Sequence, residues 1–147
     1  MVIRTEKLSK DYDGVKAVKN LNLRIEEGEI YGFLGPNGAG KTTTILMLLG
    51  ILKPTEGQIY LFGEELAKNF LGIKKRIGVV SEKQYLYKEM TAGEYLDFFA
   101  EFYGVRNKKK RIDTLLEAVN LLGVKNRRLG AFSRGMQQKL GFARALL

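Results

Sequence analysis

The sequence predicts an α/β domain in which strands surround one glycine-rich loop in the first half and helices fill the second half. Residues 35–42 read G-x-x-x-x-G-K-T, between the short apolar run Ile30–Leu34, which predicts a buried strand, and the apolar helical stretch Thr43–Leu49. Beyond Ser81, apolar residues recur at helical spacing alone. We therefore expect one domain in two parts, with sheet and loop in residues 1–80 and helices in residues 81–147.

The glycine-rich loop has the pattern of a phosphate-binding loop, which is diagnostic between a strand and a helix. Its glycines allow backbone angles that other residues avoid, so successive N–H groups can point inward at phosphate oxygens. Lys41 would reach the β- and γ-phosphates, the Thr42 hydroxyl would bind Mg²⁺, and the positive end of the following helix would face the same anion. The predicted loop residues are Gly35, Pro36, Asn37, Gly38, Ala39, Gly40, Lys41 and Thr42.

Length and composition indicate a globular chain. The 147 residues are 45% hydrophobic, enough for one domain with a core. No apolar run approaches the ~18 residues of a membrane span, and the first residues carry charges where a signal peptide is apolar. We expect a soluble cytoplasmic protein. The absence of cysteine and histidine excludes disulfides, thiolate metal sites and imidazole general-base chemistry within these residues.

The net charge of +9 suits a polyanionic partner such as nucleic acid or an acidic membrane surface. The basic residues are spread along the chain, however, and only residues 106–111 (RNKKKR) form a dense cluster. This cluster lies between two helical patterns and lacks interleaved aromatic residues for base stacking. We interpret it as a solvated loop and helix start, and we expect no nucleic-acid partner.

The first half contains several further strand patterns. Leu21–Glu26 alternates strictly between apolar and polar residues, as in a half-buried antiparallel strand, and Asp11–Gly14 predicts a turn. The other expected strands are Val2–Leu8, Gln58–Phe62 and Arg76–Val80. Residues 81–90 have no periodicity and predict a loop.

Three helices are expected in the second half. Thr91 and Glu94 form a capping box at the start of the first, whose aromatic stripe from Tyr95 to Tyr103 we interpret as core. A second helix is predicted by apolar residues at helical spacing, ends near Gly123, and carries Ile112, Leu115, Leu116 and Val119. A third helix begins at Ser133, a good N-cap.

These motifs resemble the nucleotide-binding domain of ABC transporter ATPases over essentially the whole chain. The loop GPNGAGKTT, which adds Thr43 to the phosphate-binding residues, is the form that this family favours. The resemblance implies a P-loop NTPase fold with an antiparallel β-subdomain, a partial RecA-like core and a helical subdomain. Tyr12 stands at the place of the adenine-stacking aromatic. A turn tyrosine could stack on a purine or pack on the surface, and the resemblance favours adenine contact.

Residues 77–91 resemble the Q-loop region of the family. The glutamine that helps to hold Mg²⁺ and faces the membrane partner would fall on Glu82, and a carboxylate is a sound Mg²⁺ ligand. Gln84 lies two positions further along, and the sequence leaves open which of the two residues has this role. A surface glutamate without a ligand is the alternative for Glu82.

Residues 132–139 resemble the signature motif of the family, with F-S-R-G-M in place of L-S-G-G-Q. This variant is similar to exporter-type members whose membrane subunits are separate chains. Ser133 and Gly135 stand at a helix N-terminus, where an anion is favoured. The resemblance implies that they cap the γ-phosphate bound to a second subunit. Ser133 can also be a simple helix cap, and one residue can do both.

The resemblance implies an ATP-binding subunit, with ATP and Mg²⁺ as ligands, that pairs head-to-tail with a second ATP-binding domain. It would dock on a transmembrane permease subunit at the inner face of the cell membrane and couple ATP hydrolysis to export. The docking face would comprise the aromatic helix and residues 81–90. The transported substrate is not encoded in these residues. The alternatives are a soluble ABC ATPase acting on ribosomes or DNA, and a P-loop kinase or GTPase. The motif at residues 133–139 and the antiparallel strands disfavour a kinase or GTPase.

The resemblance also leads us to expect that the sequence is an N-terminal fragment of a longer ATPase. The family's Mg²⁺-organising aspartate, its water-polarising glutamate and its γ-phosphate-sensing histidine have no counterpart in these residues, so we assign no catalytic residue here. We expect nucleotide binding with almost no hydrolysis. The strand Ile30–Leu34 would lack sheet neighbours, which invites self-association.

Overall fold

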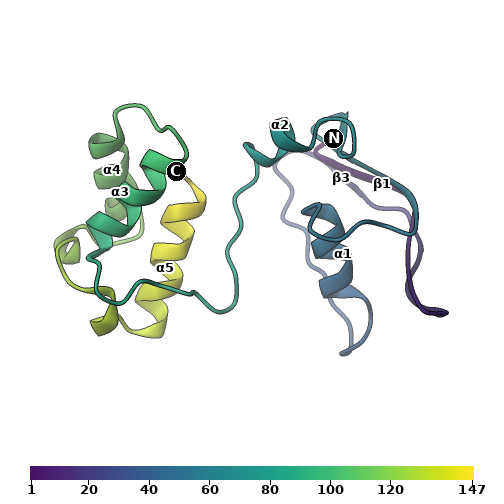
Figure 1. Ribbon diagram of the computed structural model, residues 1–147, viewed down its shortest axis with the longest axis horizontal. Coiled ribbons are helices and arrows are strands. Elements are labelled where there is room, and N and C mark those ends of the chain that lie inside the picture. The colour runs from purple at the N-terminus through teal and green to yellow at the C-terminus, as the bar shows by residue number, and fades with distance from the viewer. The chain divides into compact units, whose positions relative to one another are not determined.

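The computed structural model describes all 147 residues and divides into two compact units, Met1–Arg76 and Ile77–Leu147, each described here by itself (Figure 1). The first unit holds an antiparallel sheet and two helices, and the second holds helices without a strand. The predicted α/β class is confirmed. None of the helices is both long and apolar enough to cross a bilayer.

The sheet of the first unit is built around its longest strand. Its strands are β1 (Ile3–Tyr12), β2 (Val15–Leu21), β3 (Arg24–Ile25), β4 (Glu56–Leu61) and β5 (Glu64–Glu65). They are ordered β2-β1-β4-β5, and β3 also pairs with β1, all antiparallel. The predicted turn is the β1–β2 hairpin, in which Asp13 and Gly14 have φ angles of 50° and 88°. Two left-handed residues in succession are what a tight hairpin requires.

The predicted alternation of Leu21–Glu26 is confirmed, but the strand is shorter than predicted. Leu23 and Ile25 are buried and Arg24 is exposed, and only Arg24–Ile25 forms β3. The chain leaves the ladder after Leu21 because the buried Thr5 hydroxyl takes over two backbone partners. It donates to the Leu21 carbonyl at 2.8 Å and accepts from the Leu23 N–H at 2.9 Å.

Two helices accompany the sheet, α1 (Lys41–Leu48) and the short α2 (Phe70–Lys74). The continuous apolar run of α1 predicted a buried helix, which is only partly right: Thr44 and Met47 are buried, but Ile45 is exposed. The fully or almost fully buried apolar side chains of this unit come from both layers and are Leu8, Met47, Ile59, Leu61 and Ile73. The sequence pattern did not indicate α2, β2 or β5.

Two strand predictions are wrong. Ile30–Leu34 and Arg76–Val80 form no strand and pair with no other segment, and Ile30 and Leu34 are almost fully exposed. A short apolar run indicates that a segment prefers burial, but strands also need a neighbour to complete their hydrogen bonds. No strand of the structure lies beside either run.

The second unit contains α3 (Ala92–Phe102), α4 (Lys108–Ala118) and α5 (Arg134–Ala145), with 3₁₀ turns η1 (Leu122–Val124) and η2 (Leu129–Ala131). The predicted helices are confirmed, although α4 ends at Ala118, before the predicted stop near Gly123. They bury one continuous core that includes Tyr95, Leu96, Leu116, Leu129 and Leu140. The Tyr95 hydroxyl accepts a hydrogen bond from the Arg144 guanidinium at 2.9 Å, and burial raises the Tyr95 pKa.

The prediction that the aromatic stripe of α3 is core is only partly right. Tyr95 is fully buried and Phe99 is half-buried, but Phe98 and Phe102 are exposed, Phe102 by 78%. At about 100° per residue, Phe102 lies on the flank of the helix and Phe98 lies nearly opposite the centre of its buried face. The stripe is therefore wider than the core that receives it.

The capping box of α3 is confirmed. The Glu94 N–H donates to the Thr91 hydroxyl at 3.2 Å, and the Thr91 N–H donates to the Glu94 carboxylate at 2.7 Å. We expect Thr91→Ala to lower the free energy of unfolding by about 1 kcal/mol, because it removes an N-cap acceptor. Chemical denaturation at pH 7 measures this loss of stability, and the control is Thr114→Ala, at an exposed position within α4. Equal losses in both variants would contradict the role of the cap.

The same capping box predicts a pH dependence. The hydrogen bonds from the Thr91 backbone and side chain hold the Glu94 pKa below its ordinary value of 4.5. The stabilisation is therefore present above that ordinary value and is lost as the pH falls through the lowered pKa. Denaturation curves of Glu94→Gln between pH 7 and pH 3 should lack this part of the acid sensitivity of the wild type.

Candidate functional site

The predicted phosphate-binding loop precedes α1 in the first unit. Gly38 and Gly40 have φ angles of 83° and 78°, the left-handed region that other residues avoid. The Lys41 ammonium folds back over the loop and donates to the carbonyl oxygens of Gly35 and Pro36, each at 2.7 Å. The Lys41 side chain thus bridges the loop, and its ammonium lies where it could also bind a phosphate.

The N-terminus of α1 is arranged to favour an anion. Gly40 is its N-cap and has no side chain to accept from the first turn, and no acidic residue stands in that turn. The first N–H groups of a helix have no partner within the helix, and its dipole is positive there. Thr42 is exposed on the first turn. These donors and the Lys41 ammonium together suit a polyphosphate.

A close backbone approach holds this loop against the sheet. A Cβ on Gly40 would collide with the Ala17 carbonyl oxygen of β2 and would lie 3.0 Å from the Val18 side chain. Position 40 therefore requires glycine for two reasons, its left-handed backbone angle and the lack of space for a Cβ. This contact positions the loop relative to the β1–β2 hairpin.

Tyr12 lies at the tip of the same hairpin. It pairs with Val15, two residues before Ala17, so about 7 Å of strand separates its register position from the contact with Gly40. Its ring is 45% exposed. The Lys10 ammonium lies 5.2 Å from the centre of the ring and donates to the Lys53 carbonyl at 3.0 Å. An exposed aromatic face is therefore available on the hairpin that positions the loop.

The remaining predicted residues lie in the second unit. Ser133 is the N-cap of α5, and its hydroxyl accepts from the Met136 N–H at 3.3 Å. Gly135 is exposed in the first turn, with open space where a Cβ would stand. The helix-cap role of Ser133 is thus confirmed, and the exposed first turn of α5 resembles that of α1 in lacking acidic residues.

Glu82 and Gln84 have different surroundings. The Glu82 side chain is 86% exposed and its nearest cation is the Arg134 guanidinium at 3.8 Å. The Gln84 amide is turned inward, where it donates to the Ser81 carbonyl at 2.7 Å and packs against Gly141. The Glu82 carboxylate is the more exposed of the two, and a carboxylate oxygen is the donor type that Mg²⁺ prefers. No group of three or more acidic, cysteine or histidine residues forms a preassembled metal site.

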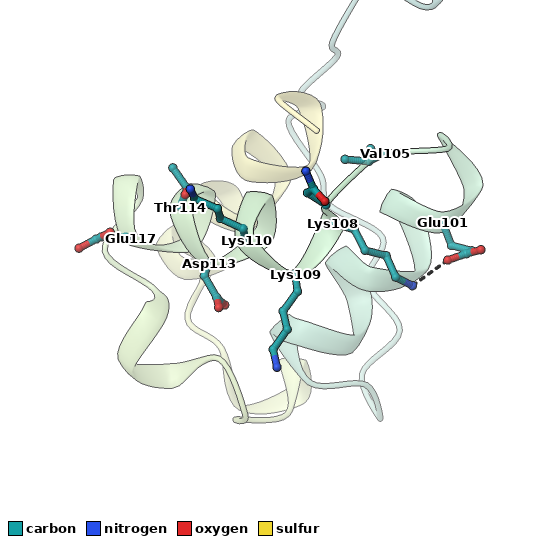
Figure 2. A pocket seen from close by; sticks show the side chains of 9 residues that line it. Glu101, Val105, Lys108, Lys109, Lys110, Asp113, Thr114 and Glu117 are labelled. Carbon is teal, nitrogen blue, oxygen red and sulfur yellow. Dashed lines mark hydrogen bonds and ion pairs between the residues drawn. The ribbon is translucent and has the colours of Figure 1, made fainter.

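The basic cluster at residues 106–111 lies at the start of α4, as predicted. Lys108 is neutralised by Glu101 at 2.7 Å and Asp97 at 3.1 Å, and Arg111 donates to the Leu146 carbonyl. Figure 2 shows Lys108 reaching toward Glu101 beside a hollow that both residues line, while Lys109, which also lines it, points away from Glu101. Two of the five cations thus have partners within the unit.

Comparison with known proteins agrees with this geometry. The family model described as ABC transporter matches residues 18–147, which include the phosphate-binding loop and residues 132–139. The chain belongs to the ABC transporter family. It is an ATP-binding domain of the P-loop ATPase class, and the predicted fold is confirmed by solved structures of the same kind.

Several relatives are similar over nearly the whole chain. The bacitracin transport ATP-binding protein BcrA of Bacillus licheniformis is 50% identical over 146 residues, covering 99% of this chain and 47% of BcrA. NatA of Bacillus subtilis is 43% identical over 136 residues, covering 90% of this chain and 55% of NatA. This ABC domain therefore spans about half the length of the curated relatives it matches.

Among solved structures, cbiO1 from Clostridium perfringens, part of the cbiONQ transporter complex, has a TM-score of 0.89 at 26% identity. The match covers 99% of this chain and 61% of cbiO1. A dimeric ATP-binding cassette, MJ0796, bound to ADP and phosphate has a TM-score of 0.81 at 28% identity, covering 98% of this chain and 68% of MJ0796.

Sequence reasoning missed three residues around these sites. Lys10 contacts the Tyr12 ring, and its i, i+2 spacing from Tyr12 in a strand was the available signal. Gln138 and Gly141 contact the segment that carries Glu82. Gly141 interrupts the α5 pattern, and a glycine inside a helix often marks a close packing contact.

The contact between Gly40 and β2 predicts a large effect of one methyl group. We expect Gly40→Ala to weaken ATP binding at least about tenfold and to cost about 1–2 kcal/mol of stability from the left-handed backbone alone. Calorimetric titration with ATP and thermal unfolding measure the two effects. Gly63→Ala, also left-handed but with open space around it and between β4 and β5, is the control and should lose stability while retaining affinity. Equal ATP affinity in Gly40→Ala and wild type would contradict the assignment.

Proposed function

We propose that this ABC domain binds ATP with Mg²⁺ and couples ATP binding and hydrolysis, at a head-to-tail dimer interface, to export through a membrane permease. The observation that carries the proposal is the phosphate-binding loop, with its left-handed glycines, uncapped helix N-terminus and inward Lys41 ammonium. Tyr12 would stack on the adenine ring, because its exposed ring lies on the hairpin that positions the loop.

The proposed Mg²⁺ ligands are the Thr42 hydroxyl and the Glu82 carboxylate. Both are exposed oxygen donors, and Gln84 is less suited because its amide is engaged within the second unit. Bound Mg²⁺ would supply charge neutralisation at the β- and γ-phosphates. Ser133 and Gly135 would meet the γ-phosphate held by a second copy. The structural relative MJ0796, described as a dimer bound to ADP and phosphate, supports pairing of two copies.

A surface of exposed aromatic side chains supports docking on a permease. Tyr85, Tyr87, Phe98 and Phe102 are all exposed, and the rings of Tyr87 and Phe98 stack edge-to-face at 6.3 Å. Isolated exposed apolar residues are ordinary, but four aromatic residues from one helix and its preceding loop mark an interaction site. We call these four residues the aromatic surface.

Export is proposed from the F-S-R-G-M variant at residues 132–136 and from the similarity to BcrA, which is described as a bacitracin transport protein. The substrate would be selected by the permease. We further propose that residues 1–147 alone bind ATP and hydrolyse almost none, because they offer no residue assigned to polarise the attacking water. Exposed Ile30 and Leu34 support self-association of these residues.

Lys41 tests the proposed nucleotide site. We expect Lys41→Ala to weaken ATP affinity at least about tenfold, because it removes a charge-assisted contact to phosphate. Equilibrium titration with ATP and Mg²⁺ measures this. Lys16→Ala, an exposed β2 lysine with no ion-pair partner, is the control. Equal affinity in Lys41→Ala and wild type would remove the phosphate-binding role.

The aromatic surface is tested separately. We expect Phe102→Glu to reduce co-purification with the permease at least about tenfold while ATP affinity stays at the wild-type value, because a charge would be buried in an apolar contact. Leu71→Glu, an equally exposed apolar position in the first unit, is the matched control. Undiminished co-purification of Phe102→Glu would show that the permease docks elsewhere.

A further inference from the structure

The end of β1 that carries Tyr12 is tied to the connector between α1 and β4. The Thr55 N–H donates to the Ser9 carbonyl at 2.9 Å, and the Asp11 N–H donates to the Thr55 hydroxyl at 3.1 Å. β2 pairs with this end of β1 on its other side. The backbone that carries Tyr12 is therefore held from both sides, although the residue itself lies at an exposed hairpin.

A third contact between β1 and the connector comes from the Lys10 side chain. Its ammonium donates to the Lys53 carbonyl at 3.0 Å and lies over the Tyr12 ring, 5.2 Å from the ring centre. A cation within about 6 Å of a ring centre is attracted by the negative π face. The neighbouring Asp11 carboxylate does not compete for this ammonium, because it accepts from the Gly14 N–H at 2.7 Å. The ammonium is thus held between a carbonyl and a ring.

This arrangement occupies one face of the Tyr12 ring. The ring is still 45% exposed with the ammonium over that face. An aromatic base needs one free face of a ring for offset stacking. A cation at the opposite face also draws π density toward itself, which reduces the repulsion between the ring and an electron-rich base. The Lys10 ammonium therefore both fixes the orientation of the ring and favours stacking on its free face.

We propose that Lys10 is a positioning residue for adenine binding, whose ammonium, fixed to the Lys53 carbonyl, holds the Tyr12 ring in the orientation that stacks on the base. The proposal deepens the proposed function and rests on it, because it takes the Tyr12 ring as the surface that stacks on adenine. Lys10 then acts on the base and not on the phosphates, which are bound by the loop and Lys41. Its contribution is present for ATP and absent for a triphosphate without a base.

The test compares ATP with inorganic tripolyphosphate, both with Mg²⁺, in two variants of the protein. Lys10→Met keeps an unbranched side chain and removes the ammonium, and Lys10→Arg keeps a cation that can lie over a ring. We expect Lys10→Met to weaken ATP binding about two- to fivefold, the size of an exposed cation–π contact, and to leave tripolyphosphate binding unchanged. Lys10→Arg should bind ATP as the wild type does. Equilibrium titration measures both affinities.

A double variant shows whether Lys10 acts through Tyr12. In a Tyr12→Ala background, Lys10→Met should cause no further loss of ATP affinity, because the ring that Lys10 positions is absent. NMR gives a second readout, since stacking on ATP should shift the Tyr12 ring protons upfield in the wild type and in Lys10→Arg, and by less in Lys10→Met. Lys19→Met removes the same charge from an exposed position on β2 and should leave both readouts unchanged.

The positioning role is overturned by any of three results. The first is an unchanged ATP affinity in Lys10→Met. The second is an equal loss of ATP and tripolyphosphate affinity in that variant, which would place the effect at the phosphates or in the stability of the loop. The third is an equal loss in the wild-type and Tyr12→Ala backgrounds, which would mean that Lys10 acts independently of the ring.

Failure of the proposed function gives a different result. If ATP binding does not depend on Lys41, the nucleotide site itself is wrongly assigned. If Tyr12→Ala binds ATP as the wild type does, adenine does not stack on this ring, and the role of Lys10 is wrong with it. If ATP affinity depends on Lys41 and Tyr12 but not on Lys10, the site stands and the positioning role alone is wrong.

Discussion

The close approach of Gly40 to the Ala17 carbonyl is the constraint on which the candidate nucleotide site depends. The Lys41 side chain bonds the phosphate-binding loop only to itself, through the Gly35 and Pro36 carbonyls, because residues that cradle phosphates must leave their backbone bare. The loop is positioned by contact with β2, and β2 is positioned by its pairing with β1. The β1–β2 hairpin therefore positions both the aromatic ring of Tyr12 at its tip and the N–H donors of α1.

The two units of this ABC domain preorganise their site residues by different means. In the first unit, left-handed backbone angles and the missing side chain of Gly40 define the loop, and the Lys41 side chain is the one that bonds to its carbonyls. In the second unit, the Gln138 amide of α5 donates to the Glu82 carbonyl and the Gln84 side chain packs on Gly141, so the position of Glu82 depends on contacts that can be broken one at a time. Rigid backbone suits a fixed phosphate cradle, and separable contacts suit a residue that must respond to its surroundings.

The features that the sequence predicted are those that depend on residues close together in the chain. The glycine-rich loop before α1 and the capping box of Thr91 and Glu94 depend on residues within ten positions of one another, and the structure has both where they were predicted. The phosphate-binding role of the loop stays a prediction. The prediction of a strand at Ile30–Leu34 failed because pairing depends on a distant neighbour that an apolar pattern does not specify. β2 was missed because its buried Val18 stands among exposed lysines without alternation. The contact between Gln138 of α5 and the Glu82 carbonyl was not predicted, because the two residues lie more than fifty positions apart in the chain.

The folded-back Lys41 side chain has a consequence for the kinetics of nucleotide capture. The Lys41 ammonium donates to the Gly35 and Pro36 carbonyls, so these hydrogen bonds hold the loop together without a ligand. The loop then does not need to refold when a ligand binds. Association then requires one side chain to swing from two carbonyls to a phosphate, a rotamer change on the picosecond to nanosecond scale. If the loop binds nucleotide as proposed, we expect its capture to be limited by diffusion and orientation rather than by a conformational gate.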